Sequence, residues 1–361
     1  MGESLPLLDK LGPTSGKGVT SVARVPNAWY VGCLSTELRN KPIARKVLGW
    51  PVVLFRDGQG VARCLVDRCP HRNVPLSLGR VLDGELECAY HGWRFDGEGQ
   101  CTRVPALSPN SRMGPGVTAW SVIEQQGLIW VYADAGSVPP KPPHFFPLVE
   151  TDEYHTVHDI VQAQGSLHAV AENALDVPHT AFLHGGLFRQ DKERHPIEVV
   201  VTRTSSQVQA QYIGEDSPKG LVGRILAPQG GEVEHYDRFL LPGILQVEYR
   251  LGEKSHLLIS GCLTPIDDFE TRLFAVVTFK LPIPAWLVKP VVRPLAHFIF
   301  RQDARILQAQ SRTIKTFGGE QYAHTEIDAL GPHIKRLLRS AERGSTATHE
   351  QQFEKRFQMY V

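Results

Sequence analysis

The sequence shows no charge excess and no regular cysteine framework, and we expect its N-terminal segment not to be a secretory leader. Its 39 Lys and Arg nearly balance 38 Asp and Glu, and the net charge of +1 gives no electrostatic reason to expect nucleic-acid binding. Six cysteines follow no regular spacing, which indicates a reducing compartment. No basic flank precedes an apolar core near the N-terminus, and no flavin- or NAD-binding fingerprint is present. We therefore expect a cytoplasmic protein that does not bind nucleic acid.

An uninterrupted apolar run is also missing. The most apolar segment, residues 281–300, contains four prolines together with Lys289 and Arg293, and these interruptions exclude a spanning helix. One interpretation is a packed connection that leads into a helix over about 300–316. The other is an apolar lip at a ligand entrance that touches a membrane, with Trp286 and the basic residues at the interface.

The chain is long enough, at 361 residues, for two domains. Short strand-like segments begin at Val25, and Asp57-Gly58 separates two of them in a predicted hairpin. A Pro-rich stretch over 136–143 indicates a stiff connector. Later strand-like segments predict a broad antiparallel sheet, and helical patterns occupy about 167–175, 300–316 and 326–342. We expect a lead-in (1–24), a β-rich domain (25–145), a second domain (146–345) and a C-terminal tail (346–361).

The stretch with the most specific chemistry is Cys69-Pro-His71, followed later by Cys88-Ala-Tyr-His91. Each short loop offers one thiolate and one imidazole. In a Rieske [2Fe–2S] cluster, two Cys hold one iron and two His hold the other. A Cys₂His₂ zinc site is the alternative, although zinc spacing normally groups Cys with Cys and His with His. We favour the Rieske cluster, because each loop here supplies one ligand of each kind.

The segments around these ligands, CPHRNVPLSLG and CAYHGWRFDGEG, resemble the Rieske domain of ring-hydroxylating oxygenases. Respiratory Rieske proteins carry an additional Cys in each loop and a Ser after the second His-Gly. Here Val74, Tyr90 and Trp93 occupy the equivalent positions. The resemblance therefore implies a cluster without a disulfide clamp and with fewer hydrogen bonds, which favours a lower reduction potential.

A second candidate metal site lies between Glu172 and His184, in the sequence ENALDVPHTAFLH. Two His and a carboxylate form the facial triad of non-haem Fe(II) oxygenases. Residues five apart do not share one face of a regular helix, so both His reach one iron only if the helix distorts or ends near Pro178. By spacing alone, packing or surface histidines are the alternative. The segment resembles the mononuclear iron motif of the same oxygenases, which implies that His179 and His184 bind Fe(II).

The third ligand has to come from elsewhere, and this family carries it on a helix near the C-terminus. Asp303 shares one face of a predicted helix with Ile306, Leu307 and Gln310. The sequence alone equally favours an acid in the first helical turn, stabilised by the helix dipole. The resemblance implies the ligand role for Asp303, with three weaker candidates: Asp237, Asp267 and Asp268.

The resemblance also implies an assembly and a role for Asp176. In this family, electrons cross between subunits of a head-to-tail trimer. An Asp three residues before the first iron His bridges that His and a Rieske His of the neighbouring subunit. Asp176 would thus lie between His179 and the neighbour's His91, and residues three apart share a helix face.

Over nearly its whole length the chain resembles the α-subunit-only Rieske non-haem iron oxygenases. The implied fold class is α+β: a β-rich Rieske domain and a helix-grip (START-like) domain, with an antiparallel sheet around a long helix. The implied chemistry is O₂ activation at Fe(II), with electrons from NAD(P)H through a separate ferredoxin or flavin reductase. A C–H bond is hydroxylated, and hydroxylation of a methyl group can lead to demethylation.

Apolar residues in the candidate pocket strands, together with segment 281–300, favour a bulky hydrophobic ring substrate such as a sterol or another polycyclic. A small methoxy- or methylamino-aromatic is the alternative. Two other classes of protein stay open. One is an electron carrier whose second domain binds no iron, and the other is a zinc-stabilised protein that carries a lipid without chemistry.

Overall fold

The computed structural model describes residues 22–184, 195–215, 233–252, 254–282, 285–344 and 353–361. The chain forms two compact units, and the main division lies between Phe145 and Phe146. The first unit holds Pro26–Phe145 and Thr264–Asp267, and the second holds the rest of the described chain.

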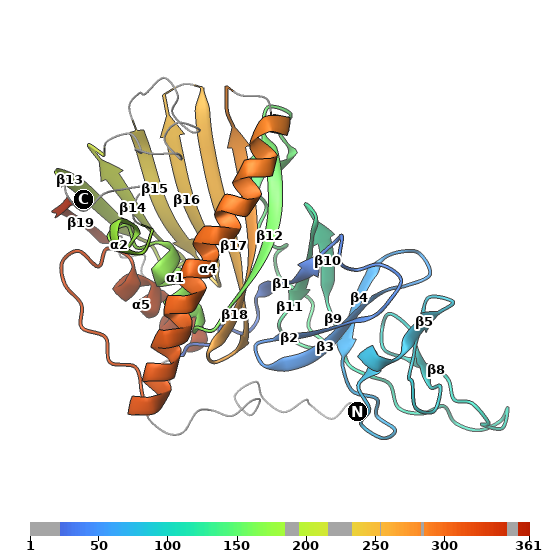
Figure 1. The fold of residues 1–361 in the computed structure, drawn as a ribbon. Coiled ribbons are helices and arrows are strands. Elements are labelled where there is room, and N and C mark those ends of the chain that lie inside the picture. Colours follow the sequence, from blue (N-terminus) through green and yellow to red (C-terminus); the bar gives the residue numbers. More distant parts are fainter. Residues whose placement is uncertain (1–21, 185–194, 216–232, 253, 283–284, 345–352) are drawn as a thin grey trace. The chain divides into compact units, whose positions relative to one another are not determined.

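The first unit is built from three antiparallel sheets (Figure 1). One contains β1 (Trp29–Leu34), β11 (Leu128–Tyr132) and β10 (Val122–Gln125). The second contains β2 (Ile43–Val47), β3 (Trp50–Arg56), β4 (Ala62–Val66) and β9 (Ala119–Trp120). The third contains β5 (Arg80–Leu82), β6 (Glu85–Glu87), β7 (Arg94–Phe95) and β8 (Cys101–Arg103).

The hairpin predicted around Asp57 is formed by β3 and β4, with Val53 paired to Leu65. Its turn depends on the Asp57 carboxylate, which accepts hydrogen bonds from the backbone N–H groups of Gln59 and Val61 at 2.9 and 3.0 Å. Such Asx turns offer the backbone an alternative to continued strand pairing, so the chain reverses there.

The second unit contains an eight-stranded antiparallel sheet in the order β12-β18-β17-β16-β15-β14-β13-β19 (Figure 1). The strand bounds are β12 His155–Ala163, β13 Pro196–Arg203, β14 Gln207–Ile213, β15 Val233–Leu240, β16 Ile244–Leu251, β17 Ser255–Asp267, β18 Glu270–Lys280 and β19 Phe353–Tyr360. The helices are α1 Leu167–Ala174, α2 Thr180–Leu183, α4 Ala285–Phe317 and α5 Gly331–Glu342, and short 3₁₀ turns form η2 Leu76–Leu78 and η3 Pro147–Glu150. The long helix α4 runs across one face of the sheet, which confirms the predicted α+β helix-grip class.

Helix α4 has 33 residues and begins at Ala285, so the prediction that a helix starts only near residue 300 was wrong. Pro290 and Pro294 lie inside α4, although proline removes a backbone donor and crowds the preceding turn. Packing on the sheet offsets this cost, because Val288 is buried in an apolar cluster with Ala275, Val277 and Phe279 of β18. Within the described residues, no helix combines the length and the apolarity that a membrane crossing needs.

The C-terminal segment also differs from the expectation of a tail over 346–361. Residues Phe353–Tyr360 form β19, which pairs antiparallel with β13 along its whole length. The charged residues of β19 are exposed, and Met359 is buried. This strand therefore belongs to the sheet of the second unit.

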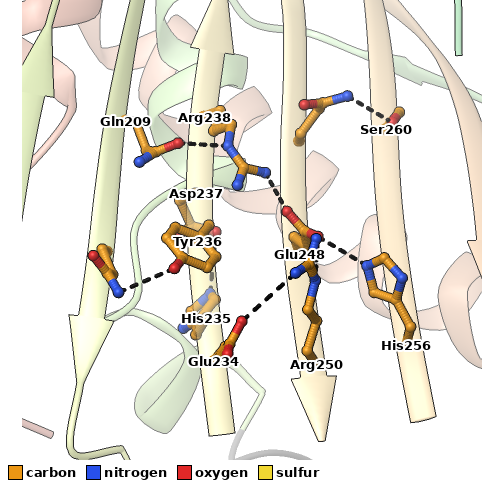
Figure 2. Close-up of polar contacts among 12 residues, drawn as sticks. Gln209, Glu234, His235, Tyr236, Asp237, Arg238, Glu248, Arg250, His256 and Ser260 are labelled. Carbon is orange, nitrogen blue, oxygen red and sulfur yellow. Dashed lines mark hydrogen bonds and ion pairs between the residues drawn. The ribbon is translucent and has the colours of Figure 1, made fainter. Parts of the chain in front are cut away.

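A charged network crosses β15, β16 and β17 on one face of the sheet (Figure 2). The buried Glu248 carboxylate accepts from Arg238 Nη1 at 2.5 Å, and from Arg250 Nε and His256 Nε2 at 2.9 Å each. Burial alone would raise the pKa of Glu248, but His256, Arg238 and Arg250 outweigh burial and lower its pKa to about 2. The network therefore links three neighbouring strands through one carboxylate.

Candidate metal centres

The two cysteine loops of the first unit repeat one hydrogen-bond pattern. The N–H of Cys69 donates to the carbonyl of Val74 at 2.9 Å, and the N–H of Asn73 donates back to the carbonyl of Cys69 at 2.9 Å. The second loop repeats these bonds at the same offsets, from Cys88 to the Trp93 carbonyl at 2.8 Å and from Gly92 to the Cys88 carbonyl at 3.0 Å. Asn73 and Gly92 adopt left-handed φ angles of 63° and 66°, which Asn and Gly tolerate best.

This repeated turn brings the four predicted cluster ligands together. Cys69 and Cys88 are buried in one apolar cluster, and the rings of His71 and His91 lie 4.4 Å apart. Nδ1 of His71 is buried and has no hydrogen-bond partner among the described residues. Burial raises the pKa of the Cys69 thiol and the nearby Cys88 adds to this, while the backbone N–H groups of His71 and Arg72 oppose it. A cationic cluster would favour both thiolates and occupy the imidazole nitrogens, so the donor set fits [2Fe–2S].

Trp93 occupies the position at which respiratory Rieske proteins carry a Ser, so this position offers no hydroxyl donor. Its ring stacks on the His71 ring, with the centroids 4.8 Å apart and the planes 7° from parallel. The Tyr90 ring packs on His91, with the centroids 3.8 Å apart. Each imidazole of the pair thus packs against one aromatic ring.

The second candidate site depends on a break in the helix, as the sequence predicted. Helix α1 starts at an N-cap, where the Ser166 hydroxyl accepts from the N–H of Ala169 at 3.2 Å, and it ends at Ala174. The short α2 follows Pro178, and its two caps are His179 and His184. The break places the two imidazole rings 5.2 Å apart, which a continuous helix would not allow.

The structure brings Asp303 to these two histidines. The ligand atoms of His179, His184 and Asp303 all lie within 4.8 Å of one another, and no other such group exists among the described residues. Oδ1 of Asp303 is 3.1 Å from Nε2 of His184 and 3.6 Å from Nε2 of His179. This oxygen is buried and accepts no hydrogen bond from the described residues. Asp303 lies well inside α4, which rules out the alternative of a first-turn acid.

The electrostatics also fit a cation. Burial would raise the pKa of Asp303, but His179 and His184 lower it overall, so the carboxylate is charged. Burial would lower the pKa of His179, whereas Asp176 and Asp303 raise it to about 9. A divalent ion at this point would replace the proton of His179, because a metal binds the neutral imidazole. Two imidazoles and one carboxylate with a buried free oxygen suit Fe(II).

Two hydrogen bonds orient the histidines. Nδ1 of His184 donates to Oε1 of Gln302 at 2.8 Å, and Nδ1 of His179 faces the backbone carbonyl of Asp176. Both contacts leave Nε2 as the nitrogen that points to Asp303. Gln302 was not predicted, because its only distinguishing feature in the sequence is its position next to Asp303.

Asp176 lies beside His179, as the resemblance implied. Its Oδ2 accepts the backbone N–H of His179 at 3.2 Å and lies 3.5 Å from Nδ1 of the same residue. The weaker candidates for the third ligand are not at the site. Asp237 contacts His235 at 3.1 Å, Asp268 pairs with Arg24 at 3.0 Å, and Asp267 is exposed.

Comparisons with known proteins match both regions of the chain. Residues 28–124 match the Rieske [2Fe-2S] domain, and residues 163–344 match the vanillate O-demethylase oxygenase C-terminal domain. The solved structure of dicamba monooxygenase bound to dicamba superposes with a TM-score of 0.78 at 25% identity, covering 90% of this chain and 99% of that chain.

Three curated relatives are similar to this chain in sequence. Protein TIC 55, chloroplastic, of Arabidopsis thaliana is 28% identical over 308 residues, which are 79% of this chain and 53% of the relative. The oxygenase component of dicamba O-demethylase from Stenotrophomonas maltophilia is 35% identical over 184 residues, or 49% of this chain and 53% of the relative. The vanillate O-demethylase oxygenase subunit of Pseudomonas sp. strain HR199 is 24% identical over 335 residues, or 86% of this chain and 93% of the relative. The chain thus spans about half the length of the first two relatives.

Proposed function

The chain belongs to the Rieske non-haem iron oxygenases, and we propose that it hydroxylates, and so demethylates, a small aromatic that carries a methoxy or N-methyl group. The observation that supports this most directly is the triad of His179, His184 and Asp303, whose ligand atoms lie within 4.8 Å of one another. Three protein ligands on one side leave positions open for O₂.

Iron bound there would supply O₂ activation, and the protein supplies position and electrostatics. In the proposed reaction, one oxygen atom of O₂ enters a C–H bond of the methyl group and the other leaves as water, with two electrons and two protons consumed. The hydroxymethyl ether or amine then releases formaldehyde and leaves a phenol or an amine. Within the site, Gln302 and the Asp176 carbonyl fix the tautomers of His184 and His179, and the Asp303 carboxylate supplies the negative charge.

The proposed substrate differs from the one favoured by the sequence. The relatives give no support to a sterol or another polycyclic. The small-aromatic alternative fits better, because two of the relatives are named for demethylation of dicamba and of vanillate.

We also propose the partners that the resemblance implied. The relatives are named as an oxygenase component and an oxygenase subunit, which supports a separate reductase for electron supply. Asp176 would carry electrons from the neighbour's Rieske cluster to His179 in a homotrimer. Mass photometry tests the assembly, and a monomer at working concentration would contradict it.

The cytoplasmic location and the membrane contact of residues 281–300 stay predictions. Trp286 supports the contact, since it is 72% exposed near the start of α4. Liposome flotation of wild type and Trp286→Ala tests it, and equal flotation of the two proteins would exclude a role for this side chain.

A single-turnover assay tests the function. Protein purified without air is reduced with dithionite, and reoxidation of the visible Rieske band is followed after O₂ is added. A methoxybenzoate, an N-methylated aromatic, a 4-methylsterol and no substrate are compared. We expect one of the small aromatics to accelerate reoxidation and yield a demethylated product. Acceleration by the sterol alone would overturn the substrate class. Iron near two rather than three per chain would support the electron-carrier alternative, and colourless protein without acid-labile sulfide would support the zinc protein.

A further inference from the structure

The second unit contains a cavity of about 190 Å³ beside the proposed iron site. Its wall includes Glu172 and Asn173 of α1, Asp176 after that helix, and Gln310 of α4. Tyr212 of β14 and residues 327–331, which lead into α5, also line the cavity. The cavity therefore reaches from Glu172 to the carboxylate next to His179.

Glu172 contacts both the solvent and the cavity. Its side chain is 25% exposed, and Nδ1 of His168 lies 4.0 Å from its carboxylate. The carboxylate packs closely on α5, since a Cβ atom at Gly331 would lie 1.8 Å from Oε1 of Glu172. A side chain at position 331 would thus displace the carboxylate, and glycine leaves it at the cavity wall.

Gln310 indicates that the cavity holds water. It lies seven residues after Asp303 in α4, on the same helical face. Its Oε1 atom is buried without a hydrogen-bond partner among the described residues. A buried amide oxygen needs a donor, and a polar cavity of this size has room for several water molecules.

We propose that Glu172 takes up protons from solvent and that water in this cavity carries them along its wall toward the iron site. The inference rests on the proposed function, in which each monooxygenation consumes two protons along with two electrons and one O₂. One oxygen atom enters the substrate and the other leaves as water, so both protons end in the products.

The charges around Glu172 suit this role. Burial raises the pKa of Glu172, the neighbouring Asp328 and Asp176 raise it further, and Glu320 adds to them. Lys335 of α5 opposes these effects, and the resulting pKa is about 7. Burial lowers the pKa of His168 to about 4, so this neighbour is neutral at pH 7 and does not hold Glu172 in its charged form. The α4 part of the wall adds no charge, since it consists of Ile306, Leu307 and Gln310. Glu172 can therefore gain and lose a proton near neutral pH.

An infrared titration tests the proton site without any catalysis. On iron-free protein, we expect the carbonyl band of a protonated carboxylic acid to disappear as the pH rises through about 7. The band should be absent from Glu172→Gln and present in Glu320→Gln. Glu320→Gln is the control for buried acids of this region, because burial raises the pKa of Glu320 as well and this residue is not part of the cavity wall. Its removal should only lower the pH at which the Glu172 band disappears. A wild-type protein without this band, or a Glu172→Gln protein that keeps it, would overturn the assignment of Glu172 as a proton site.

The transfer itself is tested by single turnover of the iron-loaded, dithionite-reduced variants. We expect Glu172→Gln to lower the rate of product formation by about tenfold or more at pH 7, with unchanged iron and cluster content. The wild-type rate should fall as the pH rises above about 7, Glu172→Asp should keep this dependence, and Glu172→Gln should lose it. An equal loss in Glu320→Gln, or a Glu172→Gln rate equal to wild type, would refute the transfer route. Absence of product from the wild type with every substrate would refute the proposed function instead, and the infrared result would still decide the proton site.

Discussion

Replacing Gln302 by Leu should weaken iron binding although Gln302 is not a ligand. The Gln302 amide oxygen accepts the Nδ1 proton of His184 at 2.8 Å, and His184 is only 2% exposed. Without the acceptor, the buried Nδ1–H group loses its partner and the ring is free to rotate or to change tautomer. Loss of such a partner typically lowers metal affinity about 10- to 100-fold, or about 1.4–2.7 kcal/mol.

Fe(II) affinity is measured without air by competition with a coloured chelator, starting from iron-free protein. Gln302→Glu keeps an acceptor at the same distance and should bind iron at least as tightly as wild type. Gln308→Leu is the matched control, since Gln308 lies on α4 and bonds to Gln164 rather than to a histidine. The spectrum of the nitric oxide complex of bound Fe(II) should change in Gln302→Leu alone. Wild-type affinity and an unchanged spectrum in that variant would refute the orienting role.

Three further predictions concern other parts of the chain. Asp176→Asn should keep full iron and cluster content but slow multiple turnover severely, because Asn cannot act as the proposed charged bridge; a wild-type steady-state rate would exclude the bridge. Cys69→Ala should lose the visible cluster band and acid-labile sulfide while the folded second unit still binds Fe(II), and retention of the band would contradict the ligand assignment. Glu248→Gln should lower the free energy of unfolding at neutral pH by about 3 kcal/mol, because the pKa of Glu248 falls from an ordinary 4.5 to about 2 in the folded protein. A lowered carboxyl pKa stabilises the fold fully above pH 4.5, and the advantage of wild type should disappear as the pH falls through 2. Urea unfolding at several pH values measures this, and a pH-independent difference would argue for lost packing instead.

The Cys and His ligands could be proposed from the sequence because their spacing is local, whereas only the family resemblance assigned Asp303. Cys69 with His71, and Cys88 with His91, each occupy one tight turn, so the ligand pattern survives as a short motif. Pro178 likewise marked the break between α1 and α2 that lets His179 and His184 approach each other. The strand-like segments predicted the broad antiparallel sheet, whereas the helix-grip class was implied by the family resemblance.

Features that depend on distant contacts were not predictable. Pro290 and Pro294 argue locally against a helix, and packing of the helix on the sheet, such as that of Val288 on β18, offsets their effect. Three consecutive charged residues lie in the segment that forms β19, and it becomes a strand because β13 offers a pairing edge. The role of Gln302 could not be predicted, because only the fold brings it next to His184, which lies 118 residues earlier.

The pairing of β19 with β13 has a consequence for aggregation. Strand β13 contains the run Val199-Val-Val201, whose high β-propensity and lack of charge suit pairing with another chain. In the folded protein, β19 occupies that edge and turns Glu354, Lys355 and Arg356 toward solvent, and charged edge strands discourage further pairing. Deleting residues 353–361 should therefore lower the solubility of the protein, although it removes no residue of the metal centres. The truncated protein should form aggregates that bind amyloid dyes.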